Sequence, residues 1–226
     1  LSNDCKAAEK KLVKAASKVY KKFLASCPAP DAPGSKQVTA LMTITGLIDA
    51  PKADKEFLSI NGAQGFSTFY GYYMLEAMAM AGNYQGALDV IREYWGAMID
   101  LGATSFWEDF DINWIPNAAP IDELVPEGKK DIHGDCGAYC YVGFRHSLCH
   151  GWASGPTSWL SRHILGVEVI EPGCRQVRIT PHLGDLQWVK GTFPTPYGEL
   201  QIYHEKQANG NVISEVKAPK GVSVIK

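Results

Sequence analysis

The residues with the clearest potential for chemistry lie between Gly102 and Asp111. Three acidic and three aromatic side chains occur there within six consecutive residues, and Trp114 follows shortly afterwards. This order does not place the aromatic residues on one face of a helix, so it predicts a folded loop that lines a pocket. Apolar walls around a few carboxylates are typical of sugar-processing sites, because aromatic faces stack on sugar rings and a partly desolvated carboxylate can exchange a proton.

Glu108 is the candidate reacting group of this loop. It directly follows an indole, Trp107, and apolar neighbours can raise the pKa of a carboxyl group by desolvation. The alternative is that Glu108 only caps the loop or forms an ion pair, since perturbed carboxylates also occur in purely structural networks. Asp109 and Asp111 are expected to fix the loop rather than to react.

A second group of candidates could bind a ligand. His150 and Trp152 directly precede a predicted helix start, where loops commonly face ligands, although a single histidine is more often structural. Trp107, Trp114, Trp152 and Phe66 are candidate walls for stacking on a sugar ring. The alternative for each of these aromatic residues is packing in the core.

A competing interpretation is a structural zinc site. Six potential ligands lie within eighteen residues: His133, Cys136, Cys140, His146, Cys149 and His150. The spacing of the first two cysteines approaches that of zinc ligands, and His150 would then be a ligand. However, the usual paired layout is missing, and two adjacent residues suit one metal ion poorly. The sequence therefore favours a site without metal or cofactor.

The composition limits the possible partners. The 226 residues allow one large domain or two small ones, and the formal net charge of −2 argues against nucleic acid or an anionic membrane as partner. No apolar run has the length of a membrane span. The six cysteines are scattered, so mostly reduced thiols are expected, and the compartment stays open. Because the chain begins without methionine or a signal-like segment, we expect a processed or excised part of a longer protein.

Hydrophobic periodicity predicts a helical first part. Helices are expected at residues 5–26, 36–49, 66–81, 84–101, 142–149 and 154–166. The third is apolar nearly all round and the fourth is amphipathic, with Gly102 in a left-handed cap after it. The break of two residues between them predicts an antiparallel helical hairpin, in which a buried inner helix packs beside a solvated outer one. Residues 111–140 carry few periodic signals and are expected to form a long loop.

The pattern changes to short alternating strands after Gly166. Six strands are expected, near residues 167–170, 177–180, 186–189, 198–203, 212–216 and 222–225. Helices followed by strands indicate an α+β multidomain protein, with residues 1–166 helical and residues 167–226 forming an antiparallel β-sandwich. This β domain could itself bind carbohydrate through Trp188, Phe193 and Tyr197, or could merely stabilise the helical part.

Two segments also resemble a known family. GATSFWEDFD at residues 102–111 and SLCHGWASGPTSWLSRHILGV at residues 147–167 are similar to the C-terminal part of glycoside hydrolase family 78 α-L-rhamnosidases, and the resemblance extends from about Phe66 onward. It implies a partial (α/α)6-barrel of helical hairpins followed by the β-sandwich. It also implies hydrolysis of α-L-rhamnosides with inversion, with Glu108 as the general base and His150 hydrogen-bonded to the rhamnose.

The resemblance further implies a general acid in an acidic, arginine-containing motif upstream of this loop. No such motif is present, because Arg92 is the first arginine of the chain. Inversion needs two carboxyl groups about 6.5–9.5 Å apart, so that a water molecule fits between them. We therefore expect the rest of the barrel, upstream of Leu1, to be the partner that completes the site, and this chain alone to be inactive.

Overall fold

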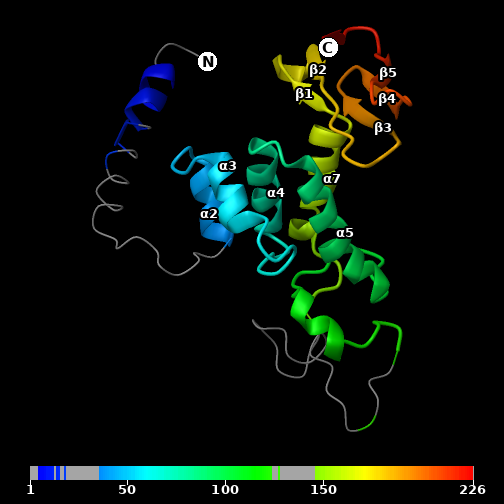
Figure 1. Cartoon of the computed structure of the whole chain (residues 1–226). Coiled ribbons are helices and arrows are strands. Elements are labelled where there is room, and N and C mark those ends of the chain that lie inside the picture. The colour runs from blue at the N-terminus through cyan, green and yellow to red at the C-terminus, as the bar shows by residue number, and fades with distance from the viewer. Residues whose placement is uncertain are drawn as a thin grey trace. The chain divides into compact units, whose positions relative to one another are not determined.

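The computed structural model describes residues 5–12, 14, 15, 18, 36–123, 127 and 146–225 (Figure 1). The chain forms two compact units, residues 1–34 and residues 35–226. In the first unit the described residues are helical and exposed, and the rest of the predicted first helix lies outside them. Most of the predicted loop after residue 123 and residues 142–145 of the next predicted helix also lie outside the described residues. The site is therefore built from the second unit.

The first part of the second unit is helical. Its α-helices are α2 (Lys36–Ile44), α3 (Ala50–Ala53), α4 (Gly71–Met80), α5 (Tyr84–Asp100) and α7 (Gly155–Trp159). Short helical segments of other types are η1 (Asp54–Leu58), η2 (Ile112–Asn117), η3 (Gly151–Ala153), η4 (Leu160–Ile164) and η5 (Pro172–Cys174). Within the described ranges, none of these helices is long and apolar enough to cross a membrane.

Several predicted helix boundaries were wrong. The expected helix at residues 36–49 ends at Ile44. A separate helix, α3, begins at Ala50 with Pro51 in its first turn. Asp49 caps α3 by accepting a hydrogen bond from the Lys52 N–H at 3.1 Å. The helix expected from Phe66 begins only at Gly71, after a series of turns. Residues 146–149 are not helical. The last predicted helix was placed correctly, because Ser154 is the N-cap of α7, which begins at Gly155 and continues into the π-helical segment η4.

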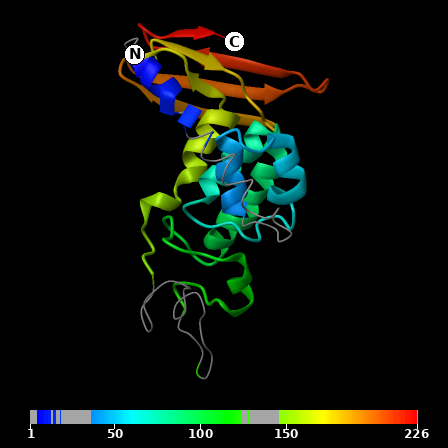
Figure 2. The same cartoon turned by 90° about the vertical axis from the view of Figure 1, so that its left-hand side faces the viewer.

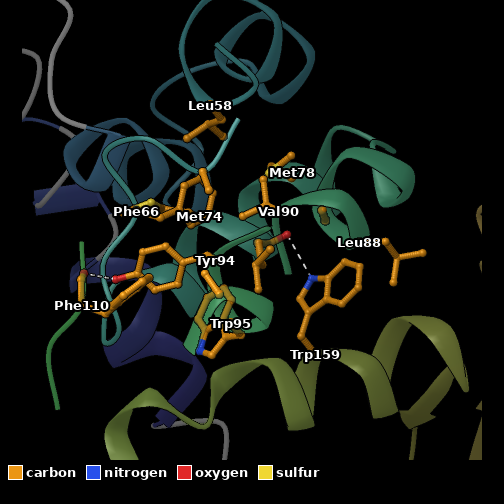
Figure 3. Packing of buried hydrophobic residues seen from close by; sticks show 14 of the residues in the cluster. Leu58, Phe66, Met74, Met78, Leu88, Val90, Tyr94, Trp95, Phe110 and Trp159 are labelled. Atoms are coloured by element: carbon orange, nitrogen blue, oxygen red, sulfur yellow. Dashed lines mark hydrogen bonds between the residues drawn. The ribbon is translucent and has the colours of Figure 1, made fainter. Parts of the chain in front are cut away.

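The predicted pair of central helices is present as α4 and α5, which pack against each other. Asn83 caps α5 by accepting a hydrogen bond from the Gly86 N–H at 2.9 Å, and Gly102 follows the helix with a φ of +91°. Figure 3 shows the core on the buried faces of these helices, with Met74 and Tyr94 near its centre. Burial of these large side chains is the main favourable contribution to folding of this part.

Two buried indoles join distant segments of the helical part. Trp159 of α7 donates a hydrogen bond to the Leu75 carbonyl at 3.0 Å, drawn as a dashed line in Figure 3. Trp95 of α5 donates to the Ala153 carbonyl at 3.0 Å. A buried backbone carbonyl must find a donor, so these contacts fix how α4, α5 and the segment before α7 meet.

Six strands follow the helices, close to the positions predicted. They are β1 (Val167–Val169), β2 (Gln176–Ile179), β3 (Trp188–Thr195), β4 (Gly198–Lys206), β5 (Val212–Lys217) and β6 (Ser223–Ile225). They form two three-stranded sheets, in the orders β1-β2-β6 and β3-β4-β5. The second sheet is antiparallel throughout, whereas the first is mixed, because β6 pairs in parallel with β2. The expectation of purely antiparallel strands was therefore wrong for one pair.

The two sheets share an apolar cluster. Its buried members are Leu165, Val167, Val177, Ile179, Leu200 and Ile202. His204 is fully buried and bonds through its ring to the Leu165 carbonyl at 3.1 Å, which ties β4 to the end of the helical part. A turn at Asn209-Gly210 joins β4 to β5, with a φ of +84° at Gly210, and Asn-Gly is a common pair in such hairpin turns. Figure 2 shows the strands gathered at one end of the unit.

We predict that Gly166→Ala destabilises the chain far more than Gly173→Ala. Both glycines have a left-handed φ, +71° and +74°, so either alanine costs on the order of 1 kcal/mol of strain. A methyl group at Gly166 would also lie 2.3 Å from the backbone carbon of Thr180, whereas one at Gly173 meets nothing within 4 Å. Urea unfolding of both variants measures the difference, and equal losses would show that Gly166 is not sterically constrained.

Candidate functional site

The acidic loop, residues 102–111, is hydrogen-bonded to two distant segments, mainly through Glu108. The Glu108 N–H donates to the Ser147 carbonyl at 2.8 Å, and nearby the His150 N–H donates to the Phe106 carbonyl at 2.7 Å. The Glu108 carbonyl accepts from the Thr68 hydroxyl at 2.5 Å and from the Trp152 indole N–H at 2.8 Å. These bonds hold the loop between the turn before α4 and the segment before α7.

Glu108 is one of the residues that line a cavity of about 370 Å³. The other lining residues are Gln37 of α2, Ser67, Thr68, Phe69 and Tyr70 of the turn before α4, Asp109 and Trp152. One carboxylate oxygen of Glu108, Oε2, accepts the Ser147 N–H at 2.9 Å. Among the described residues no cation forms an ion pair with Glu108.

The neighbouring carboxyl group, Asp109, has different surroundings. Its Oδ1 accepts the Phe110 N–H at 2.9 Å, while its Oδ2 is buried and has no hydrogen-bond partner among the described residues. Burial raises the pKa of Asp109, and the nearby charges of Asp111 and Glu108 raise it further, against the effect of the Phe110 N–H. The loop therefore presents a desolvated carboxyl group beside Glu108.

Trp152 lines this cavity, and the predicted sugar-binding residue His150 contacts Trp152 without being among the described walls. The ring centroids of His150 and Trp152 are 4.3 Å apart, and that of Phe69 lies 5.8 Å from the indole. Trp152 is 48% exposed, which leaves part of the indole free to contact a ligand. Because the same indole donates to the Glu108 carbonyl, an exposed ring is positioned directly by the candidate base.

Three other predicted wall residues are packed in the helical part. Trp107 is fully buried and packs edge-on against Phe110, with ring centroids 6.0 Å apart. Trp114 is half-buried against the same ring at 6.2 Å, and Phe66 is buried near Tyr94 at 6.4 Å. None of these three is among the described walls of the cavity. Their contact with a sugar stays a prediction.

The residues that sequence reasoning missed come mainly from the turn before α4. Ser67 and Thr68 line the cavity between the aromatic residues 66, 69 and 70. This run of two hydroxyls among aromatic side chains was the available signal, but the apolar pattern was interpreted as the start of a helix. Gln37 gave no signal, because it lies on α2 among ordinary helical residues.

The alternatives from the sequence analysis are only partly covered by the structure. His133, Cys136 and Cys140 of the zinc hypothesis lie outside the described residues, and the described part holds no cluster of residues that could bind a metal. Cys149 and Cys174 are free thiols. In the β domain, two of the predicted sugar-stacking residues are exposed, Trp188 by 60% and Tyr197 by 42%. The third, Phe193, packs against the apolar cluster.

We predict that Asp109→Asn gains stability relative to the unchanged chain as the pH rises. The pKa of Asp109 is raised above its ordinary value of 3.8 in the folded state. Above pH 3.8 the folded state therefore binds more protons than the unfolded state. Stability is therefore lost as the pH rises from about 4 towards neutral, and asparagine removes that loss. Urea unfolding across this range measures it. The exposed Asp122→Asn should show no such trend, and a flat difference for Asp109→Asn would contradict the assignment.

Comparison with known proteins agrees with this architecture. A family model described as the bacterial alpha-L-rhamnosidase C-terminal domain matches residues 166–225. No curated protein matches the chain significantly. A solved family 78 rhamnosidase from Bacillus sp. GL1 is similar with 26% identity and a TM-score of 0.64, covering 84% of this chain and 18% of that one.

Two further solved structures show the same fold at lower identity. The α-L-rhamnosidase from Aspergillus terreus has 19% identity and a TM-score of 0.72, covering 95% of this chain and 24% of that one. The enzyme from Streptomyces avermitilis, solved with L-rhamnose, has 18% identity and a TM-score of 0.66, covering 92% of this chain and 20% of that one. This chain thus spans about a fifth of the length of these structures. It has the mixed helix and sheet content of part of a rhamnosidase, and the resemblance to glycoside hydrolase family 78 α-L-rhamnosidases that its sequence predicts is confirmed.

Proposed function

We propose that this chain is part of an inverting glycoside hydrolase that cleaves terminal α-L-rhamnosyl linkages, with Glu108 as the general base. The observation that carries the proposal is that Glu108 lines a cavity together with Trp152, whose exposed indole donates to the Glu108 carbonyl. The similarity to rhamnosidases, one of them solved with L-rhamnose, supports the choice of sugar.

The geometry of Glu108 suits a base that activates water. Its Oε2 accepts the Ser147 N–H, and among the described residues no donor reaches Oε1, which can therefore accept a proton from water. The water oxygen would form a bond to the anomeric carbon from the face opposite the departing oxygen, while its proton passes to Glu108. This arrangement inverts the configuration at that carbon.

The departing oxygen must receive a proton from a second carboxyl group. We propose that this acid lies in a part of the protein outside this chain, so the chain alone does not turn over substrate. Because inversion needs about 6.5–9.5 Å between the two carboxyl groups, the acid must lie across the cavity from Glu108. Asp109 keeps the loop-fixing role that was expected from the sequence.

Sugar binding is assigned to the ligand-facing residues around the base. Trp152 would stack on the apolar face of the sugar, and His150 beside it would donate or accept a hydrogen bond to a sugar hydroxyl. Trp107, Trp114 and Phe66 remain predicted sugar contacts. No cofactor is needed for this reaction, since acid–base groups and water suffice.

The architecture proposed for the whole protein follows the same relationship. Residues 1–166 would form the last part of an (α/α)6-barrel, and residues 167–226 a β-sandwich packed on it. The pairing of α4 with α5, one mostly buried and one amphipathic, supports a barrel built from helical hairpins. The rest of the barrel, upstream of Leu1, would then be the partner that completes the site.

Replacing the proposed base tests this function. In the complete enzyme, Glu108→Gln should lower kcat for hydrolysis of an aryl α-L-rhamnoside by about a hundredfold or more, because positioned acid–base groups contribute at least that much. Glu123→Gln, which changes an exposed acid farther along the chain, should leave the rate unchanged. Proton NMR of the first product formed should show the inverted anomer.

The kinetic result can also reject the assignment. If Glu108→Gln loses less than about tenfold, the carboxylate is not the base, since so small a loss fits a positioning effect. If the first product retains the anomeric configuration, the two carboxyl groups act by a different mechanism and the inverting proposal fails.

A further inference from the structure

A second, larger groove of about 830 Å³ adjoins the cavity of Glu108. It lies between α4, the segment from Trp152 through η4, and residues of β1 and β3. The two hollows share two lining residues, Phe69 and Trp152, whose rings are 5.8 Å apart. A ligand with one end beside Glu108 could therefore extend past this aromatic pair into the groove.

One wall of the groove is aromatic. Tyr73 lies 5.8 Å from Phe69 and 5.4 Å from Tyr72, with ring centroids as reference points, so the rings continue from Trp152 along the start of α4. Phe69 is 40% exposed and Trp152 is 48% exposed, although both are large aromatic residues. Exposed rings beside a cavity suit the apolar faces of sugar rings, which stack on them.

Another part of the groove's lining carries hydroxyl groups on α7 and η4. Ser158 donates to the Gly155 carbonyl at 3.0 Å, and Ser161 donates to the Thr157 carbonyl at 3.1 Å. Each hydroxyl proton is thus used within the helix, while the oxygen keeps lone pairs that can accept a further hydrogen bond. This wall is suited to a ligand that brings hydroxyl donors of its own.

The charges in the groove are compensated. Arg162 pairs with Glu76 at 3.4 Å, and Glu168 pairs with Arg178 at 2.7 Å. The two charged residues that line the groove, Arg162 and Glu168, have opposite signs, so the groove as a whole attracts neither an anion nor a cation. The groove therefore favours a neutral ligand with apolar faces and hydroxyl groups, which is the chemistry of an uncharged oligosaccharide.

We propose that this groove binds the sugar to which the terminal rhamnosyl group is linked, so that the substrate is a neutral oligosaccharide. The inference rests on the proposed function, because it places the terminal sugar beside Glu108. Trp152 would contact both sugars, one on each side of the linkage. The hydroxyls of α7 and η4 would fix the second sugar by hydrogen bonds.

The test is calorimetric titration of the complete enzyme carrying Glu108→Gln, which removes the proposed base so that the probes are not hydrolysed during the measurement, with three probes. They are L-rhamnose, an α-L-rhamnosyl-glucose disaccharide and 4-nitrophenyl α-L-rhamnoside. The disaccharide should bind at least about tenfold more tightly than L-rhamnose, because the second sugar adds stacking and hydrogen bonds. The nitrophenyl compound should gain less, since it lacks the hydroxyl donors.

Substitutions at Ser158 locate the gain. Ser158 is exposed, so Ser158→Trp fills the groove without entering the core and should bring the disaccharide to within about twofold of L-rhamnose. Lys220→Trp places the same side chain at an exposed position that does not line the groove and should leave all affinities unchanged. Ser158→Ala removes only the hydroxyl and should lose a smaller part of the gain, which keeps the test valid if the tryptophan variant folds poorly.

The outcomes separate this inference from the proposed function. Binding of L-rhamnose without tighter binding of the disaccharide would overturn the groove assignment and leave Glu108 in place. A gain for the nitrophenyl compound alone would replace the oligosaccharide with a planar aryl group. If the Ser158 variants keep the full gain, the second sugar binds elsewhere. Binding of none of the probes would contradict the proposed function as well.

Discussion

The structure depends on indole N–H groups that donate to backbone carbonyls of distant segments. Trp95 reaches Ala153, Trp159 reaches a carbonyl of α4, and Trp152 reaches the carbonyl of Glu108. The paired residues are 58, 84 and 44 positions apart in the chain. An indole can supply a donor to a backbone carbonyl while adding a large apolar surface. Of the three contacts, the one from Trp152 holds the candidate base directly, and the other two hold the helical segments around it.

Local patterns were sufficient for most of the secondary structure and failed where tertiary contacts decide. The amphipathic spacing of α5 and the turn at Gly210 lie within one short stretch, so the sequence contains the information needed to predict them. The residues around Thr68 are as apolar as a buried helix. They form turns because that hydroxyl bonds to the Glu108 carbonyl forty residues away. In the same way, the parallel pairing of β6 with β2 joins strands far apart in sequence, and no local signal specifies it.

The candidate site shows the same division between local and non-local information. Glu108 could be chosen from the composition of its own loop, and its proposed role came from the family resemblance. The cavity around it could not be predicted, because its walls come from α2, from the turn before α4 and from Trp152. Trp107 was expected to face a ligand but is fully buried, since the side chain that follows a helix end can turn into the core as readily as outwards.

The two adjacent carboxyl groups of the loop have surroundings that suit different tasks. A general base must meet water, and Glu108 lies on the cavity wall with its Oε1 unbonded by any described residue. Asp109 has a buried oxygen, and burial raises its pKa, so ionisation of this second carboxyl group is disfavoured. Two full negative charges on neighbouring residues would repel each other and would attract cations into the cavity. The raised pKa of Asp109 includes part of this repulsion, because the charges of Asp111 and Glu108 add to the effect of burial.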